Sequence, residues 1–246
     1  MPHTQNSGQA LTTRFFRTSF ALVCAALLSA CAGPVQLPVD LPANYFSGGV
    51  AKANRIGVVM SELPKPDTAF PGANCLLCLG VANLAHGSLN KEVQTFSTAE
   101  LKPLSADLVA LLQKQGFDAV LISEPVKVAD IPNFKAGDAP NKARKDFSAL
   151  KDKHKLDRLL VVDITSLGVW RSYSAYIPTS TPSAIANGTA TIVDLGNNNL
   201  DWYLPINLSR KAEGNWDEPP KFPGLSNADY QLLESISDMV KKPFAK

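Results

Sequence analysis

The sequence is poor in the residues and motifs on which most hydrolases and nucleotide-binding enzymes depend. It holds three histidines in 246 residues, namely His3, His86 and His154. It contains no Gly-x-Ser-x-Gly, no glycine-rich phosphate loop and no His-Glu-x-x-His, which excludes the common lipase, nucleotide and zinc-protease sites. A Ser/His/Asp triad would have to use one of the histidines, and His154 lies in a lysine-rich stretch. We therefore expect a protein that is not an enzyme and that needs no cofactor and no metal.

The chain also lacks an apolar run long enough to span a bilayer. A spanning helix needs about 20 apolar residues, whereas the apolar run near the N-terminus covers only Phe20–Ala30. Arg14 and Arg17 precede this run, and small residues occupy the two positions before Cys31. Positive, apolar and small-residue parts in this order predict a cleaved signal peptide over residues 1–30.

The segment Leu28–Cys31, Leu-Ser-Ala-Cys, resembles the lipobox of bacterial lipoproteins. The resemblance implies that Cys31 becomes the lipidated first residue, with several palmitate-like acyl chains that attach the protein to a membrane. Cys24 is a poorer candidate because bulky residues precede it, and an ordinary secretory peptide is the alternative. Alanine, and not aspartate, follows Cys31, so the resemblance implies the outer membrane, on its periplasmic face.

No excess of either charge remains once this segment is removed. Residues 1–30 carry two arginines and no acid, so the 24 basic residues fall to 22, equal to the 22 acidic ones. A neutral chain gives no electrostatic basis for binding nucleic acid. Taking 30 residues from 246 leaves 216, which suits one domain. We expect residues 31–50, with three evenly spaced prolines, to form a semi-rigid tether and residues 51–246 to form the domain.

Hydrophobic patterning divides this domain into strands and helices. Apolar, β-branched runs predict strands over residues 55–60, 118–122, 158–167, 184–195 and 200–208. Helices are predicted between Pro103 and Gly116, over residues 141–155, and from Ser226, as the capping residue, to Pro243. The resulting order, β-α-β-α-β-β-β-α, predicts an α/β (α+β) fold with a mixed sheet of about five strands flanked by helices.

This order, together with the lipobox, resembles the α/β domain shared by the amino-terminal domain of TolB, the curli-secretion lipoprotein and the lipoprotein activators of peptidoglycan synthases. In addition, residues 74–78, 170–178 and 216–223 are similar to segments of uncharacterised proteobacterial outer-membrane lipoproteins. Members of the broader group act in assembly, secretion or regulation. The resemblance therefore implies an unknown periplasmic protein partner or self-association into a homo-oligomer.

Cys75 and Cys78 are the only cysteines of the mature chain besides Cys31. In an oxidising compartment, two cysteines at this spacing are expected to form a local disulfide. Two alternatives stay open: a thiol-redox pair at the start of a helix, and a metal site with His86 as third ligand. The two intervening leucines disfavour the first, and the lack of carboxylates at ligand spacing disfavours the second.

The surroundings of the cysteine pair are strongly apolar. From Ala73 to Ala85 only Asn74 and Asn83 are polar, so the run has to be hidden from water. We favour packing on the domain as additional core; the alternative is a patch that pairs with another subunit, a partner or the lipid surface. The interface candidates in this run are Leu76, Leu77, Leu79 and Val81.

Aromatic residues gather in a later segment, between residues 170 and 216. Exposed aromatic rings mixed with an arginine would suit a protein or glycan interface. We favour instead a sheet face covered by the proline-rich segment around Phe222. The interface candidates in this segment are Trp170, Arg171, Tyr173, Tyr176, Trp202 and Trp216.

Two hypotheses about function follow. The first is a lipid-anchored, non-catalytic binding or assembly module of the bacterial envelope, acting through protein partners or self-association. The second is a thiol-redox or metal-dependent envelope enzyme centred on Cys75 and Cys78. Whether the two sulfurs lie in an open cleft or under the apolar run bears directly on the choice.

Overall fold

The computed structural model describes residues 35–46, 55–124, 126–136, 139–218 and 221–245. The chain divides into two compact units, Met1–Gln36 and Leu37–Lys246, and the fold described below is that of the second unit. The predicted signal peptide and the lipidation candidate Cys31 lie outside the described residues. Every helix in the described part of the chain is too short or too polar to cross a membrane.

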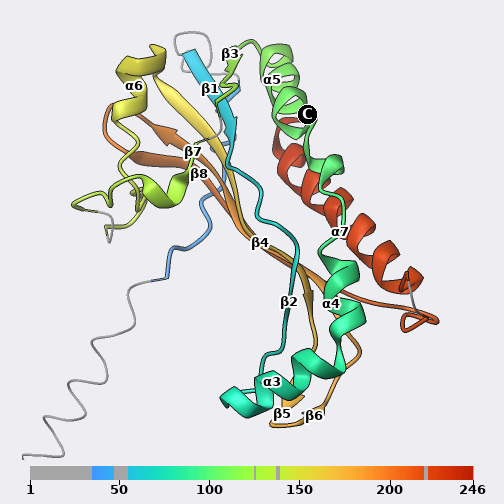
Figure 1. Ribbon diagram of the computed structural model, residues 1–246. Coiled ribbons are helices and arrows are strands. Elements are labelled where there is room, and N and C mark those ends of the chain that lie inside the picture. The colour runs from blue at the N-terminus through green and yellow to red at the C-terminus, as the bar shows by residue number, and fades with distance from the viewer. Residues whose placement is uncertain (1–34, 47–54, 125, 137–138, 219–220, 246) are drawn as a thin grey trace, which may run out of the picture. The chain divides into compact units, whose positions relative to one another are not determined.

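A six-stranded mixed sheet organises this unit (Figure 1). Its strands run in the order β3-β1-β4-β7-β8, with β2 beside the distal part of β4. β1 pairs in parallel with β3 and β4, whereas β7 pairs in antiparallel orientation with β4 on one side and with β8 on the other. The strands are β1 (Arg55–Met60), β2 (Asp67–Ala69), β3 (Asp118–Leu121), β4 (Arg158–Trp170), β7 (Ser183–Asp194) and β8 (Asn199–Lys211). The predicted mixed α/β fold is confirmed, and its strand order along the chain is as expected.

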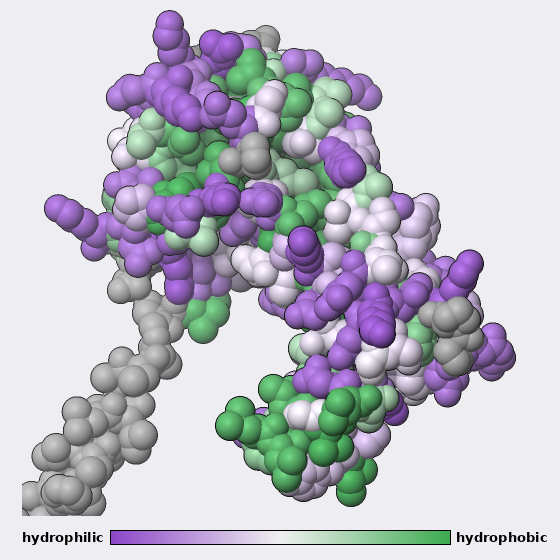
Figure 2. Space-filling view, in the orientation of Figure 1, coloured by the Kyte–Doolittle hydropathy of each residue, from purple (hydrophilic) through white to green (hydrophobic). Residues whose placement is uncertain are grey.

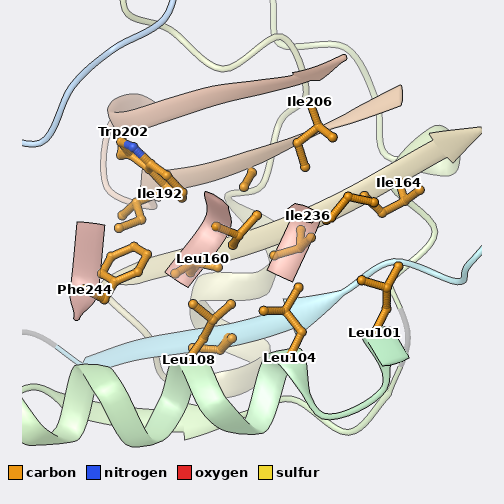
Figure 3. Close-up of a cluster of buried hydrophobic side chains, with 14 of the residues drawn as sticks. Leu101, Leu104, Leu108, Leu160, Ile164, Ile192, Trp202, Ile206, Ile236 and Phe244 are labelled. Carbon is orange, nitrogen blue, oxygen red and sulfur yellow. The ribbon is translucent and has the colours of Figure 1, made fainter. Parts of the chain in front are cut away.

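Two helices cover one face of the sheet and close the main core. They are α5 (Leu104–Lys114) and α7 (Pro223–Lys241), the latter continued by a 3-10 turn over Lys242–Phe244. Leu104, Leu108 and Leu112 of α5 recur at helical spacing and are fully buried, which is the pattern of an amphipathic helix on a sheet. Figure 3 shows these side chains meeting those of the strands and of α7. The cluster includes Leu104, Leu108, Leu160, Ile192, Trp202, Ile206, Ile236 and Phe244.

A second core lies on the opposite face of the sheet, near β1 and the N-terminal end of β4. Short helical segments cover it, namely a 3-10 turn over Val128–Asp130 and α6 (Ala149–His154). Its buried members include Phe147, Leu156, Leu159, Val193 and Leu200. Together the two cores fix the sheet between helical layers at this end.

The long strands β4 and β7 continue well past these cores and carry a smaller distal part (Figure 1). It comprises α3 (Leu76–Ala85), α4 (Gly87–Val93) and a short hairpin of β5 (Tyr173–Ser174) and β6 (Ile177–Pro178). The sequence patterns did not predict α3 and α4 as helices, nor β2, β5 and β6 as strands. These elements are short, and α3 is apolar on most of its circumference, so its residues show no simple helical stripe.

The helix expected over residues 141–155 is wrong for its first half, because only α6 forms. The side-chain amide of Asn198 donates to the carbonyls of Ala143 and Lys145, at 3.0 and 2.9 Å. Its oxygen accepts from the N–H of Phe147 at 3.3 Å. These bonds from the β7–β8 turn hold residues 143–147 in an irregular conformation.

The predicted capping of the last helix by Ser226 is also wrong. The helix begins three residues earlier, at Pro223, after Phe222 in a left-handed conformation. Proline is well suited to the first turn of a helix because its missing N–H would be unsatisfied there. The hydroxyl of Ser226 donates instead to the carbonyls of Lys221 and Phe222.

The proline-rich segment expected as a tether over residues 31–50 packs on the domain along its described part. Val39 and Tyr203 exchange backbone hydrogen bonds of 3.0 and 2.9 Å. Tyr45 is buried and its hydroxyl donates to Asp201 at 3.1 Å, while Phe46 packs edge-on against Phe244. Residues 37–46 are thus part of the compact unit and not a spacer before it.

Candidate interaction surface at the end of the distal part

The helix α3 presents large apolar side chains to solvent. Leu76 is 93% exposed, Leu84 86% and Leu77 67%, and Leu79 and Val81 are also exposed. Of the apolar run from Ala73 to Ala85, the structure buries only Ala73, Cys78 and Ala82. The favoured prediction that this run forms additional core is therefore wrong, because only one narrow face of α3 meets the domain.

Cys75 and Cys78 are joined by a disulfide, as predicted. Cys75 caps the N-terminus of α3, and its sulfur accepts a hydrogen bond from the N–H of Cys78 at 2.9 Å. Cys78 is buried in a small cluster with Phe70 and Tyr173, whereas Cys75 is exposed. The bond therefore fixes the first turn of the helix, with one sulfur inside and one at the surface.

The β5–β6 hairpin extends the apolar surface beside α3. Tyr176 and Ile177 at its turn are exposed, and the Tyr176 hydroxyl lies 3.9 Å from the Cys75 sulfur. Gly72 lets the segment before α3 approach the hairpin closely, since a Cβ there would collide with the Tyr173 carbonyl and its φ is +92°. The helix and the hairpin are thus held together.

We call this surface the apolar tip and define it by Leu76, Leu77, Leu79, Val81, Leu84, Tyr176 and Ile177. Figure 2 shows hydrophobic residues gathered at this end of the described domain. No Asp, Glu, Lys or Arg occurs over residues 68–90 or 172–193, the two segments that build it. Leu84 and Ile177 were missed as candidates, although Leu84 lies in the apolar run and Ile177 follows Tyr176.

His86 supports the tip from beneath, at the junction of α3 and α4. Its Nε2 lies 2.6 Å from the Tyr173 hydroxyl and 3.1 Å from Nη1 of Arg171, and its ring stacks on Phe70. Burial and, to a lesser extent, the charge of Arg171 lower the pKa of His86. The lowered pKa favours the neutral ring, and the ring is engaged by protein groups. Within the described ranges, no three His, Cys, Asp or Glu side chains gather to hold a metal ion.

The aromatic interface candidates separate into exposed and buried groups. Trp170 and Tyr176 are exposed, and Arg171 stacks over the half-buried Trp216 at 5.2 Å. Tyr173 and Trp202 are buried, which agrees with the favoured interpretation of a covered face and corrects their choice as interface candidates. The cover over Trp202 is Phe244 and not the expected segment around Phe222. Trp202 lies on the α7 side of β8 and packs edge-on against Phe244 in the main core.

A cleft of about 680 Å³ lies elsewhere, beyond the carboxyl end of β1. It is lined by Ser61, whose buried hydroxyl has no hydrogen-bond partner, and by Asp163. Lys127 forms an ion pair with Glu62 at 3.7 Å. The Lys145 ammonium donates to the carbonyls of Ala129 and Ile131. Because both signs of charge line the cleft, its electrostatics single out no class of ligand.

No protein-family model and no curated protein matches the chain. Among solved structures, the PelC dodecamer from Paraburkholderia phytofirmans aligns at 11% identity, covering 85% of this chain and 95% of that one, with a TM-score of 0.34. Lipoprotein GNA1162 from Neisseria meningitidis aligns at 16% identity, covering 76% and 98%, with a TM-score of 0.31. Protein XCC0632 from Xanthomonas campestris aligns at 10%, covering 86% and 94%, with a TM-score of 0.33. Likenesses this distant carry no argument about family or function, and the resemblance to the TolB and curli-secretion domains stays a prediction.

Proposed function

We propose that this chain is a lipid-anchored, non-catalytic protein of the bacterial envelope that works by docking through its apolar tip. The anchor is the predicted lipid on Cys31, and the location is the periplasmic face of the outer membrane. The observation that carries the proposal is the exposure of adjacent large apolar side chains on α3. Contiguous apolar surface of this kind marks interaction sites in soluble domains.

The residues on which a thiol-redox or metal-dependent enzyme would depend have structural roles here. Cys78 is buried and bonded to Cys75, and His86 is held by Tyr173 and Arg171. These contacts stiffen the base of the apolar tip. A rigid base favours docking, because less conformational entropy is lost when the tip becomes covered.

Photocrosslinking in the native envelope tests the docking role. A photoreactive amino acid replaces Leu77, and in a matched control it replaces Tyr230, which is exposed on α7. We expect a specific adduct from position 77 and none from position 230. An anchored, folded protein that gives no adduct from position 77 would contradict the proposal.

The anchor is tested separately through Cys31→Ala. The unsubstituted chain is expected to incorporate labelled acyl chains and to sediment with outer membranes. The variant is expected to lose the label and to leave the lipidated fraction, since the thiol that would carry the lipid is gone. Retained labelling of the variant would mean that the acyl chains are attached to a residue other than Cys31.

Thiol–disulfide exchange is the second candidate, favoured by the exposed sulfur of Cys75 at the N-cap of α3. A substrate thiolate would attack the Cys75 sulfur and release the Cys78 thiolate, and the second thiol of the substrate would then displace Cys75, so that the substrate dithiol is oxidised to a disulfide and the pair is reduced. The double variant Cys75→Ser/Cys78→Ser decides between the two. A folded variant that keeps the adduct from position 77 excludes an obligatory thiol role, whereas lost dithiol oxidase activity with intact folding would support the enzyme.

A further inference from the structure

The exposed side chains of the apolar tip cover more than half of the circumference of α3 instead of forming one narrow stripe. At 3.6 residues per turn, the exposed positions from Leu79 through Leu76 to Val81 span roughly 200° of the helix circumference. Only Cys78 and Ala82 are buried on the remaining face. A protein partner with a flat surface would reach only part of so wide an arc, whereas a fluid apolar phase reaches all of it.

We infer that the occupant of the apolar tip is a lipid bilayer surface, into which α3 and the β5–β6 turn insert. This inference rests on the docking function proposed above and names what the tip binds. It gives the protein a second membrane contact in addition to the predicted lipid on Cys31. The two contacts have different chemistry, since one is covalent and the other is a folded surface.

Electrical neutrality favours lipid over a protein partner. The two segments that build the tip carry no Asp, Glu, Lys or Arg, and His86 beneath them has a lowered pKa. Entry into the bilayer therefore removes no full charge from water, which would be the largest opposing cost. A protein interface, by contrast, commonly uses charged groups at its rim to fix orientation and register.

Two polar groups within the tip are already hydrogen-bonded inside the protein. The side-chain amide of Asn83 donates to the carbonyl of Leu79 at 2.9 Å. The N–H of Cys78, in the first turn of α3, donates to the Cys75 sulfur. Groups satisfied in this way lose little when water is replaced by acyl chains.

The base of the tip carries the residues expected at a membrane–water boundary. Trp170 is partly exposed there, Arg171 lies beside His86, and Lys91 is exposed on α4. Tryptophan and long basic side chains are favoured at the level of lipid headgroups. The ten residues of α3 extend about 15 Å, half of the roughly 30 Å hydrocarbon core, so the tip inserts shallowly and does not span.

Depth-dependent quenching tests this inference on the full lipidated chain in vesicles of phosphatidylethanolamine and phosphatidylglycerol. Leu77→Trp places a reporter in the tip, and Tyr230→Trp places one on α7 as the matched control. The emission of the parent chain, which has three tryptophans, is subtracted from each. With brominated lipid in the vesicles, we expect a blue shift and several-fold stronger quenching for position 77 than for position 230.

Each other result contradicts lipid insertion. Emission typical of water at position 77 means that the tip does not enter the bilayer. A blue shift without quenching, accompanied by oligomers in crosslinking, means that a second copy covers the tip. If quenching fails while position 77 gives protein adducts in the envelope, the lipid inference is wrong but the docking function stands; if both fail, both are wrong.

Salt provides a further readout. Because the tip is uncharged, quenching of the reporter at position 77 is expected to be the same at low and high ionic strength, where screening weakens charge-driven contacts. Loss of the signal in high salt would show that charged groups elsewhere bring the protein to the bilayer. Insertion would then depend on those charged groups, which contradicts an insertion driven by the apolar surface of the tip.

Discussion

Asp229 is a buried acid on α7, close to Glu100, whose Oε2 is buried without a hydrogen-bond partner. Burial, reinforced by the charge of Glu100, raises the pKa of Asp229 from 3.8 to about 7. Between these two values the folded protein binds more protons than the unfolded chain, so its stability falls as pH rises. Above pH 7 the full penalty of the buried charge is present.

Asp229→Asn is therefore expected to increase the free energy of unfolding at pH 8 by about 1–4 kcal/mol. At pH 4, where the folded parent carries a neutral acid, the variant should differ little. Urea unfolding of both proteins at pH 4, 6 and 8 measures the difference. Parallel pH profiles of the two proteins would show that Asp229 is not responsible for the loss of stability at high pH.

Asn198 combines a left-handed backbone with three hydrogen bonds to residues 143–147. Asn198→Ala should cost about 2–4 kcal/mol, because it leaves buried carbonyls unpaired and because alanine tolerates a positive φ less well than asparagine. Asn198→Gly is the informative control, since glycine accepts this φ and loses only the hydrogen bonds. In chemical denaturation, the free energy of unfolding should therefore decrease from the parent to Asn198→Gly and further to Asn198→Ala. Equal losses in the two variants would show that the left-handed backbone contributes nothing to the effect.

At the scale of elements, α3 is expected to contribute little to folding through its leucines. The triple variant Leu76→Gln/Leu77→Gln/Leu84→Gln alters only exposed side chains, so the free energy of unfolding should change by less than about 1 kcal/mol. Leu89→Gln on neighbouring α4 alters a side chain that is 1% exposed and should cost about 3 kcal/mol or more. Thermal unfolding compares them. A large loss in the triple variant would mean that these leucines are core residues after all.

The disulfide is expected to act on α3 alone. It joins two cysteines that lie three positions apart in the sequence. It therefore removes little conformational entropy from the unfolded chain as a whole. In Cys75→Ser/Cys78→Ser, hydrogen exchange should speed up in α3 while α5 and α7 keep their protection. Uniformly faster exchange would contradict this local role.

At the scale of the whole molecule, the segment Leu37–Phe46 behaves as part of the domain. Tyr45→Ala should lower the free energy of unfolding by about 3 kcal/mol, since it removes a buried ring that stacks on Phe117. Tyr45→Phe should cost only about 1 kcal/mol for the hydrogen bond to Asp201. Leu37→Ala, on an exposed side chain, is the control. A stable Tyr45→Ala variant would restore the tether interpretation for this segment.

Sequence patterns predicted the elements whose own periodicity matches their burial. The leucines of α5 and the β-branched run of β1 are examples, and both elements form close to the predicted bounds. Prediction failed where distant contacts decide the conformation, as for residues 143–147, which are held by Asn198 some fifty positions later.

The candidate surface was predictable only in part. Composition singled out the run around Leu76 and Leu77, but apolarity alone does not distinguish a buried segment from one that awaits a partner. That difference depends on how far β4 and β7 carry α3 beyond the main core, which no local pattern encodes. Trp202 was an interface candidate but is buried. The register of a strand decides which face of the sheet a given side chain lies on, and the sequence alone does not show that register.

The open edge of strand β8 bears on whether the protein aggregates at high local concentration. It is the last strand of the sheet, and its free side carries only isolated bridges to Val39 and Lys142 among the described residues. An open edge of this kind is a template on which neighbouring copies can stack into fibrils. Pro205 interrupts its row of N–H donors, and Arg210 and Lys211 place like charges at its exposed end. If the proposed anchor crowds copies on a membrane, these residues would keep neighbouring β8 strands from pairing edge to edge.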